Sequence, residues 1–182
     1  MEEFAYILDI LPQGRMEENV FKRVPLAIAI GELELKLFEL ITKPGAVITI
    51  GDRVYIGKEI EKRDKIASVR RRISYEEMTP GAQNEIEFVL RNIVENNEAR
   101  FVNFFNNAQP ITTRLHQLDL LYGVGKNLMW EIIDERKKGP FKDFQDIKSR
   151  IKGLRDPEKM ITERILRELK NKDERHRLFV SN

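Results

Sequence analysis

The stretch Tyr122-Gly123-Val124-Gly125-Lys126 decides how the C-terminal part of this chain folds. Two glycines around one apolar residue allow backbone angles that other residues avoid, and they keep side chains away from the turn. Leucines at helical spacing precede the turn, and Met129, Ile132 and Ile133 follow it on one face of a second helix. The pattern predicts a helix–turn–helix hairpin in which Val124 packs between the two helices.

Anion binding is the chemistry expected of this turn. Because Gly125 has no side chain, the second helix begins with unpaired N–H groups at its positive dipole end, which suits a phosphate group. Lys126 adds a positive charge at the same end. The candidate site comprises Gly123, Val124, Gly125, Lys126 and Asn127. The alternative is an ordinary glycine-rich helical hairpin, which needs only one glycine after its first helix.

A weaker copy of this unit follows in the sequence. Gly153-Leu154-Arg155 has an arginine where the second glycine would be, and Asp156-Pro157 forms a favourable helix start. A capping carboxylate occupies the amides that a phosphate would need, so the second turn is expected to act mainly as a structural partner of the first. Lys148, Lys152 and Arg155 remain candidates for contacting a nucleic-acid backbone from the side.

The N-terminal part has the pattern of β-strands. Short apolar or alternating segments recur with turn signals about every 8–12 residues. We expect strands at residues 4–8, 32–40, 47–50, 53–57 and 66–73. Roughly five or six strands of this length suit a small antiparallel β-barrel of the OB-like or SH3-like kind.

After residue 74 the hydrophobic pattern changes from period two to helical spacing. The sequence therefore predicts an α+β chain of several domains. A β-barrel is expected at residues 1–74, an all-α linker at 75–110 and a tandem helical-hairpin domain at 111–182.

Basic residues between positions 58 and 72 of the expected barrel suggest a second surface for nucleic acid. The candidates are Arg63, Lys65, Arg70 and Arg72. In a regular strand Arg70 and Arg72 face one side and Arg71 faces the other. Such a face can bind a single strand through charge and stacking. The alternative is a solvated edge strand whose charges prevent aggregation.

Composition excludes several classes of protein. The 182 residues contain no cysteine, so disulfides, thiolate catalysis, zinc ribbons and iron–sulfur clusters are ruled out. No apolar run is long enough to span a membrane, and the acidic start is unlike a secretory signal, so we expect a cytoplasmic protein. The 32 basic and 30 acidic residues nearly cancel, yet residues 111–182 carry 17 basic and 12 acidic side chains, a net +5.

Residues 112–170 resemble a tandem helix-hairpin-helix domain of the kind found in DNA-uptake and Holliday-junction-binding proteins. The resemblance rests on residues 118–126, on Ile132-Ile133, on Gly139-Pro140-Phe141-Lys142 and on the following Phe144 and Asp146-Ile147. Met129 departs from the alanine that is usual at its position. The resemblance implies that the hairpin amides bind the sugar–phosphate backbone, largely without sequence preference.

The whole chain also resembles an uncharacterised archaeal protein family described as nucleic-acid- or RNA-binding. The segments that carry this resemblance are Tyr6-Ile7-Leu8-Asp9, Pro12-Gln13-Gly14-Arg15, Arg53-Val54-Tyr55-Ile56-Gly57 and residues 110–116. The resemblance implies an N-terminal barrel followed by the helix-hairpin-helix domain. It supplies no activity.

These observations favour a non-catalytic protein that binds nucleic acid, with RNA favoured over DNA on the family description alone. Because phosphate contacts do not read sequence, binding should depend on salt and little on sequence. No cofactor, metal, catalytic pair or membrane is expected. One alternative is a scaffold for protein partners in the translation or transcription machinery. A nucleic-acid-processing enzyme ranks third.

Overall fold

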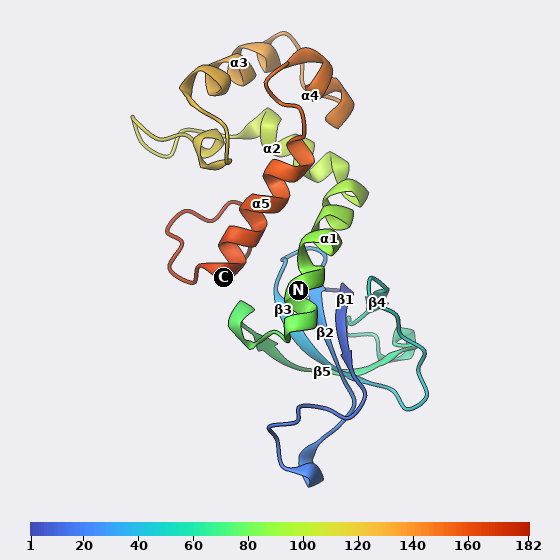
Figure 1. The fold of residues 1–182 in the computed structure, drawn as a ribbon. Coiled ribbons are helices and arrows are strands. Elements are labelled where there is room, and N and C mark those ends of the chain that lie inside the picture. Colours follow the sequence, from blue (N-terminus) through green and yellow to red (C-terminus); the bar gives the residue numbers. More distant parts are fainter. The chain divides into compact units, whose positions relative to one another are not determined.

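The computed structural model describes residues 1–182 as a mixed α+β fold with five strands and five α-helices (Figure 1). The strands are β1 (Phe4–Leu11), β2 (Leu26–Gly31), β3 (Leu37–Thr42), β4 (Arg53–Tyr55) and β5 (Ile66–Ile73). The α-helices are α1 (Pro80–Asn96), α2 (Glu98–Asn107), α3 (Lys126–Lys137), α4 (Phe144–Arg150) and α5 (Pro157–Lys170). Short 3₁₀-helices are η1 (Val20–Lys22), η2 (Ile60–Lys62), η3 (Tyr75–Glu77) and η4 (Gln117–Leu120).

The chain packs as two compact units. Unit 1 comprises Met1–Val89 and Glu168–Asn182, and unit 2 comprises Leu90–Arg167. The division into domains at 1–74, 75–110 and 111–182 stays a prediction. None of the helices combines the length and the apolar character that crossing a bilayer requires.

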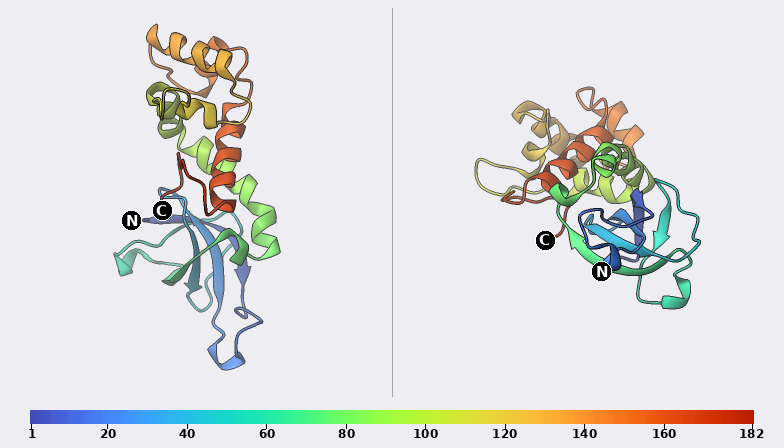
Figure 2. Two further views of the ribbon diagram at one scale, coloured as in Figure 1. Left: turned by 90° about the vertical axis from the view of Figure 1, so that its left-hand side faces the viewer. Right: turned by 60° about the horizontal axis from the view of Figure 1, so that its bottom comes forward.

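Unit 1 is built on one antiparallel sheet with the strand order β4-β1-β2-β3-β5. Every residue of the central strand β2 is buried, so both faces of the sheet are covered there. The sheet curls (Figure 2), and it stays open because β4 and β5 are its two edges. A core cluster is formed by Ala5, Ile7, Ala27, Ala29, Leu40, Val54, Ile56 and Ile66.

Two expected strands differ from the structure. Residues 32–36 connect β2 to β3, and only the rest of the expected 32–40 strand belongs to β3. In this connection Leu35 is fully buried with a φ of 57°, a left-handed conformation that ends the alternation of a strand. Glu2 holds the connection by accepting hydrogen bonds from the backbone N–H groups of Leu33 and Glu34. The expected strand at 47–50 is irregular, and Val47 is 80% exposed.

The helices follow the predicted apolar spacing and start signals. Thr79 accepts a hydrogen bond from the Ala82 N–H at 3.1 Å, and Pro80 is the first residue of α1. α1 ends at Asn96 and α2 starts at Glu98, so the chain breaks its helix at Asn97. The core of unit 2 is drawn from every helix, and it includes Leu90, Ile93, Phe101, Phe105, Leu118, Leu121, Ile132, Phe144, Ile147, Leu154, Ile161 and Ile165.

The helix expected before the glycine pair is shorter than predicted. Thr112 does not cap a helix, because its hydroxyl accepts hydrogen bonds from the Arg114 and Leu115 N–H groups and closes a local turn. An isolated bridge between Pro110 and His116 follows, and only η4 is helical before the turn. The turn is therefore entered from a single 3₁₀ turn.

Candidate functional site

Residues 122–126, hereafter the glycine turn, lead from η4 into α3. Gly123 has a φ of +85°, a left-handed conformation that a side chain would strain. Val124 is 7% exposed, and its N–H donates to the Leu121 carbonyl oxygen at 3.1 Å. The inward position predicted for Val124 is thus observed.

The start of α3 is open. Gly125 is its N-cap residue, and no side chain caps the helix. The first N–H of α3 with a partner in the helix ladder is that of Met129, which donates to the Gly125 carbonyl oxygen at 2.9 Å. Nothing lies within 4 Å of the place where a Cβ on Gly125 would stand. The first amides of α3 therefore have no side-chain cap at the positive end of the helix dipole, and there is free space beside Gly125.

Lys126 begins α3 and is held beside the turn. Its ammonium group donates to Asp119 Oδ2 at 2.6 Å and to the Arg114 carbonyl oxygen at 2.9 Å. The side chain is still 57% exposed. Lys126 thus places a positive charge at the open helix start while it is paired on one side. Asn127, the next residue, is exposed.

His116 supports the same segment from inside. It is 6% exposed, and its Nδ1 accepts a hydrogen bond from the Leu118 N–H at 3.0 Å. Burial, and the nearby positive charge of Arg136, hold the pKa of His116 below its usual value. His116 is therefore a neutral N-cap for η4.

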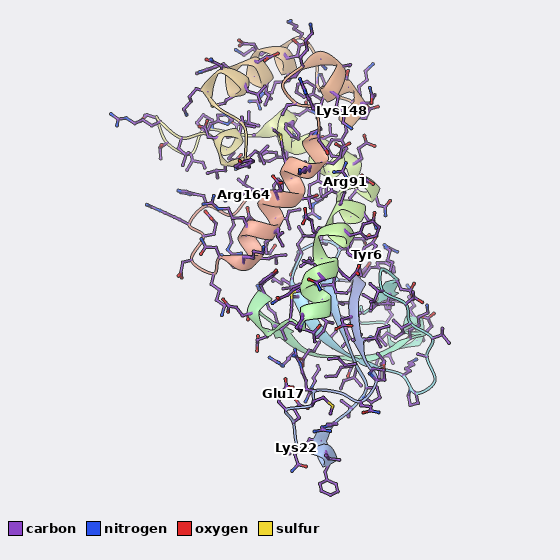
Figure 3. All side chains as sticks on the ribbon, in the orientation of Figure 1. Tyr6, Glu17, Lys22, Arg91, Lys148 and Arg164 are labelled. Carbon is purple, nitrogen blue, oxygen red and sulfur yellow. The ribbon has the colours of Figure 1, made fainter.

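A cleft of about 690 Å³ is lined in part by the glycine turn. One wall consists of residues 119–124, and the other is formed by Glu163, Arg164 and Arg167 of α5. Arg164, which Figure 3 labels on α5, is 3% exposed, and its Nη1 lies 3.5 Å from the Leu120 carbonyl oxygen. Tyr122 lines the cleft and is 81% exposed. The cleft thus combines apolar, aromatic and charged groups.

The second turn has a different structure. A Cβ on Gly153 would lie 2.9 Å from Leu128 Cδ1, so this glycine packs closely against α3 and a larger residue would displace the end of the Leu128 side chain. Asp156 caps α5 by accepting from the Lys159 N–H at 3.0 Å, and it accepts two hydrogen bonds from Arg91 at 3.1 Å each. Burial opposes ionisation of Asp156, but the hydrogen bonds from Arg91 and Lys159 keep its pKa below the usual value. A carboxylate already occupies this helix start.

The three cations expected around the second turn differ in their surroundings. Lys148 donates to the buried carboxylate of Glu158 at 2.8 Å, so it serves the packing of α4 against α5. Lys152 and Arg155 are exposed. Of the three, Lys152 and Arg155 present their charge to solvent, as contact with a nucleic-acid backbone requires.

The cations expected on the sheet surface are mostly bound within unit 1. Arg63 donates to the backbone oxygens of Gly57, Ile56 and Ala67 at 2.8 to 3.2 Å. Lys65 pairs with Asp52 at 3.4 Å. Arg72 is exposed and donates to the Ser181 carbonyl oxygen at 3.3 Å. These contacts favour the alternative reading of a charge-protected edge strand, since β5 is an edge of the sheet.

A bulge in β5 changes the side on which its arginines lie. The pairing of β3 with β5 shifts register between Glu39 and Leu40, so Arg70 has no partner opposite it. Arg70 and Arg71 therefore both reach Glu39, at 3.7 and 3.0 Å. The expected strict alternation was wrong at this point. Arg70 also donates to Glu18 at 2.8 Å, which leaves it little capacity for an external phosphate.

Comparison with known proteins places the chain in a family. A family model described as "Protein of unknown function (DUF655)" matches residues 1–181. The chain belongs to the DUF655 family. An uncharacterized DUF655-like relative, MJ0038 of Methanocaldococcus jannaschii, is 44% identical over 180 residues, which is 98% of this chain and 80% of that protein.

The fold is shared with a solved structure of the family. The crystal structure of Af1531 from Archaeoglobus fulgidus, described as belonging to DUF655, has 44% sequence identity and a TM-score of 0.90. The match covers 99% of this chain and 100% of that one. The prediction of an uncharacterised archaeal family is confirmed.

Sequence reasoning about this DUF655 chain missed the cleft. Tyr122 was expected only as part of the turn, and Arg164 and Arg167 were not among the candidate residues. The spacing of three residues places both arginines on one side of α5, which was an available signal. What the sequence could not supply is that α5 lies against the glycine turn.

Proposed function

We propose that this protein binds nucleic acid through phosphates at the glycine turn, prefers RNA, and catalyses no reaction on it. The observation that carries the proposal is the uncapped start of α3, with free space beside Gly125. Backbone N–H groups at a helix start bind phosphate without reading the base. The resemblance of residues 112–170 to tandem helix-hairpin-helix domains supports the same ligand.

Within this proposal the second hairpin is a structural partner. Asp156 fills its helix start and pairs with Arg91, so only the first hairpin offers free amides. Lys152 and Arg155 add exposed positive charge on the same unit. The curled sheet of unit 1, which we take as an OB- or SH3-like half-barrel, contributes Arg72 and half-exposed Lys65 rather than the whole basic set.

A titration with single- and double-stranded RNA and DNA at several salt concentrations tests this function. We expect affinity to fall steeply as salt rises, because bound phosphates displace counterions. Gly125→Asp should weaken binding by about tenfold or more, since its carboxylate would occupy the amides and repel the phosphate.

The same variant controls for folding. Aspartate is a favourable N-cap, so Gly125→Asp should unfold at the same temperature as the natural protein or a higher one. Asn84→Asp, which adds an identical charge on the exposed surface of α1, should leave affinity unchanged. Equal binding by Gly125→Asp and Asn84→Asp would remove the glycine turn from the site.

A scaffold remains a second candidate function because of one loop. The β1–β2 loop carries exposed apolar side chains: Phe21 is 97%, Val20 is 66% and Met16 is 65% exposed. Lys22 and Glu17 of the same loop are labelled in Figure 3, where the loop extends away from the sheet. If no nucleic acid binds, a crosslinking experiment with a photoreactive group at position 21 would test for a protein partner.

A further inference from the structure

The cleft beside the glycine turn is a feature of unit 2 that phosphate binding leaves unused. Its volume of about 690 Å³ lies in the range of small-molecule sites. Its lining includes Leu120, Leu121 and Val124 as apolar wall, with Tyr122 among the lining residues. Packing of the hairpin does not explain the exposed Tyr122, because the buried Val124 already packs between the helices.

We infer that this cleft holds one unpaired nucleotide of the bound strand, with its base stacked on Tyr122. The inference rests on the proposed function, which brings a phosphate to amides only a few residues away along the chain. Aromatic side chains stack on every kind of base, so this contact needs no sequence preference.

Charged groups at the cleft suit the edges of a base. Arg167, which is exposed, carries hydrogen-bond donors, and Glu163 carries acceptors, whereas the buried Arg164 supplies positive charge to the cleft wall. Bases present both donors and acceptors at their edges, and an unstacked base exposes them fully. A cleft lined by cationic donors alone would suit a simple anion better than a base.

The stacking surface also distinguishes between strands. A base within a duplex has neighbours on both faces, so it reaches Tyr122 only after leaving the stack at an energetic cost. A strand end, a loop or a single strand offers the base without that cost. The structure therefore favours single-stranded or unpaired nucleic acid at the glycine turn.

Fluorescence anisotropy with a labelled short oligoadenylate tests the inference directly. Tyr122→Ala should lower the single-strand affinity about tenfold, whereas Tyr122→Phe should keep it because the ring alone stacks. Affinity for a blunt duplex should be equal in all three proteins. Phe88→Ala, which removes a ring that is 68% exposed on α1, is the matched control and should bind like the natural protein.

A second measurement reports the contact itself. An oligonucleotide with one 2-aminopurine should lose emission on binding to the natural protein and to Tyr122→Phe, and keep it with Tyr122→Ala. An abasic nucleotide at the same position should reduce affinity for the natural protein to that of Tyr122→Ala. Equal single-strand affinity of Tyr122→Ala and the natural protein would overturn the inference.

Comparison with Gly125→Asp separates the two proposals. If Gly125→Asp weakens single strands and duplexes while Tyr122→Ala changes nothing, phosphate binding stands and the nucleotide cleft is rejected. If Tyr122→Ala weakens single strands while Gly125→Asp changes nothing, the cleft is supported and the phosphate site falls. Loss of neither kind of binding in either variant rejects both.

Discussion

At the scale of residues, buried carboxylates hold distant parts of unit 1 together. Glu39 is fully buried and accepts hydrogen bonds from Arg15 at 2.8 Å and from Arg71 at 3.0 Å. Glu2, whose pKa is raised by burial, fastens the connection between β2 and β3. Such a group is stable inside a protein only while its partners remain, because an unpaired buried charge is costly.

Glu39→Ala should therefore lower the free energy of unfolding by about 3–5 kcal/mol, since it leaves Arg15 and Arg71 without their shared acceptor. Urea denaturation followed by circular dichroism measures the change. Glu61→Ala removes an exposed carboxylate from η2 and should alter stability by less than about 0.5 kcal/mol. Similar losses in both variants would contradict the role assigned to Glu39.

At the scale of elements, the last turn of α5 clasps the C-terminal segment. Glu168 is fully buried and accepts hydrogen bonds from the backbone N–H groups of Leu178, Phe179 and Val180 at 2.7, 3.1 and 2.9 Å. Ser181 then donates its N–H to the Glu34 carbonyl oxygen at 3.1 Å. The Glu168 carboxylate is thus a central attachment of the segment, and hydrogen bonds made by Arg72, Arg177 and Ser181 add to it.

Glu168→Gln should loosen this clasp, because an amide has one acceptor oxygen where the carboxylate uses two. Hydrogen exchange at Leu178, Phe179 and Val180 should become faster by about tenfold or more, in line with loss of charge-assisted hydrogen bonds. Glu131→Gln on the exposed face of α3 serves as the control. Unchanged exchange in Glu168→Gln would show that other contacts hold the segment.

The sequence predicted the helix starts and the glycine turn better than it predicted the strands. Helix starts were predictable because Thr79-Pro80 and Asp156-Pro157 act locally. The alternation of leucine and charge at residues 32–36 resembles that of a strand, but tertiary contacts such as those of Glu2 hold these residues in a turn. The partners of the arginines in β5 could not be predicted, since the bulge and the pairing with Glu39 depend on strands distant in sequence. The glycine turn was predictable because its residues act locally.

At the scale of the whole molecule, ion pairs predict loss of stability in acid. Arg71 and the Ser74 N–H lower the pKa of Glu77 to about 2, and Lys36 with the N-terminal amine lowers that of Glu34 to about 2. In the unfolded chain both carboxyl groups have pKa values near the ordinary 4.5. The unfolded state therefore binds more protons between pH 4.5 and 2, so stability is full above that range and is lost as pH falls through it.

The free energy of unfolding from urea titrations at several acidic pH values checks this prediction. Because both carboxylates are partly exposed, each should contribute about 0.5–1 kcal/mol after solvent screening. Glu77→Gln, which keeps an acceptor for the Ser74 N–H, should flatten the curve below pH 4.5 and change little above pH 6 beyond a constant offset. If the free energy of unfolding of Glu77→Gln changed with pH as it does in the natural protein, Glu77 would not be a source of the acid sensitivity.

Synthesis of unit 1 starts before that of unit 2, but all residues of unit 2 are made before the last residues of unit 1. Both unit boundaries fall inside helices, so unit 2 is a continuous segment that interrupts unit 1. On the ribosome, the sheet of unit 1 emerges first, yet unit 1 lacks its last piece until Glu168 and the residues after it leave the exit tunnel. Because units fold as they become available, unit 2 can finish while the sheet still waits for its C-terminal clasp.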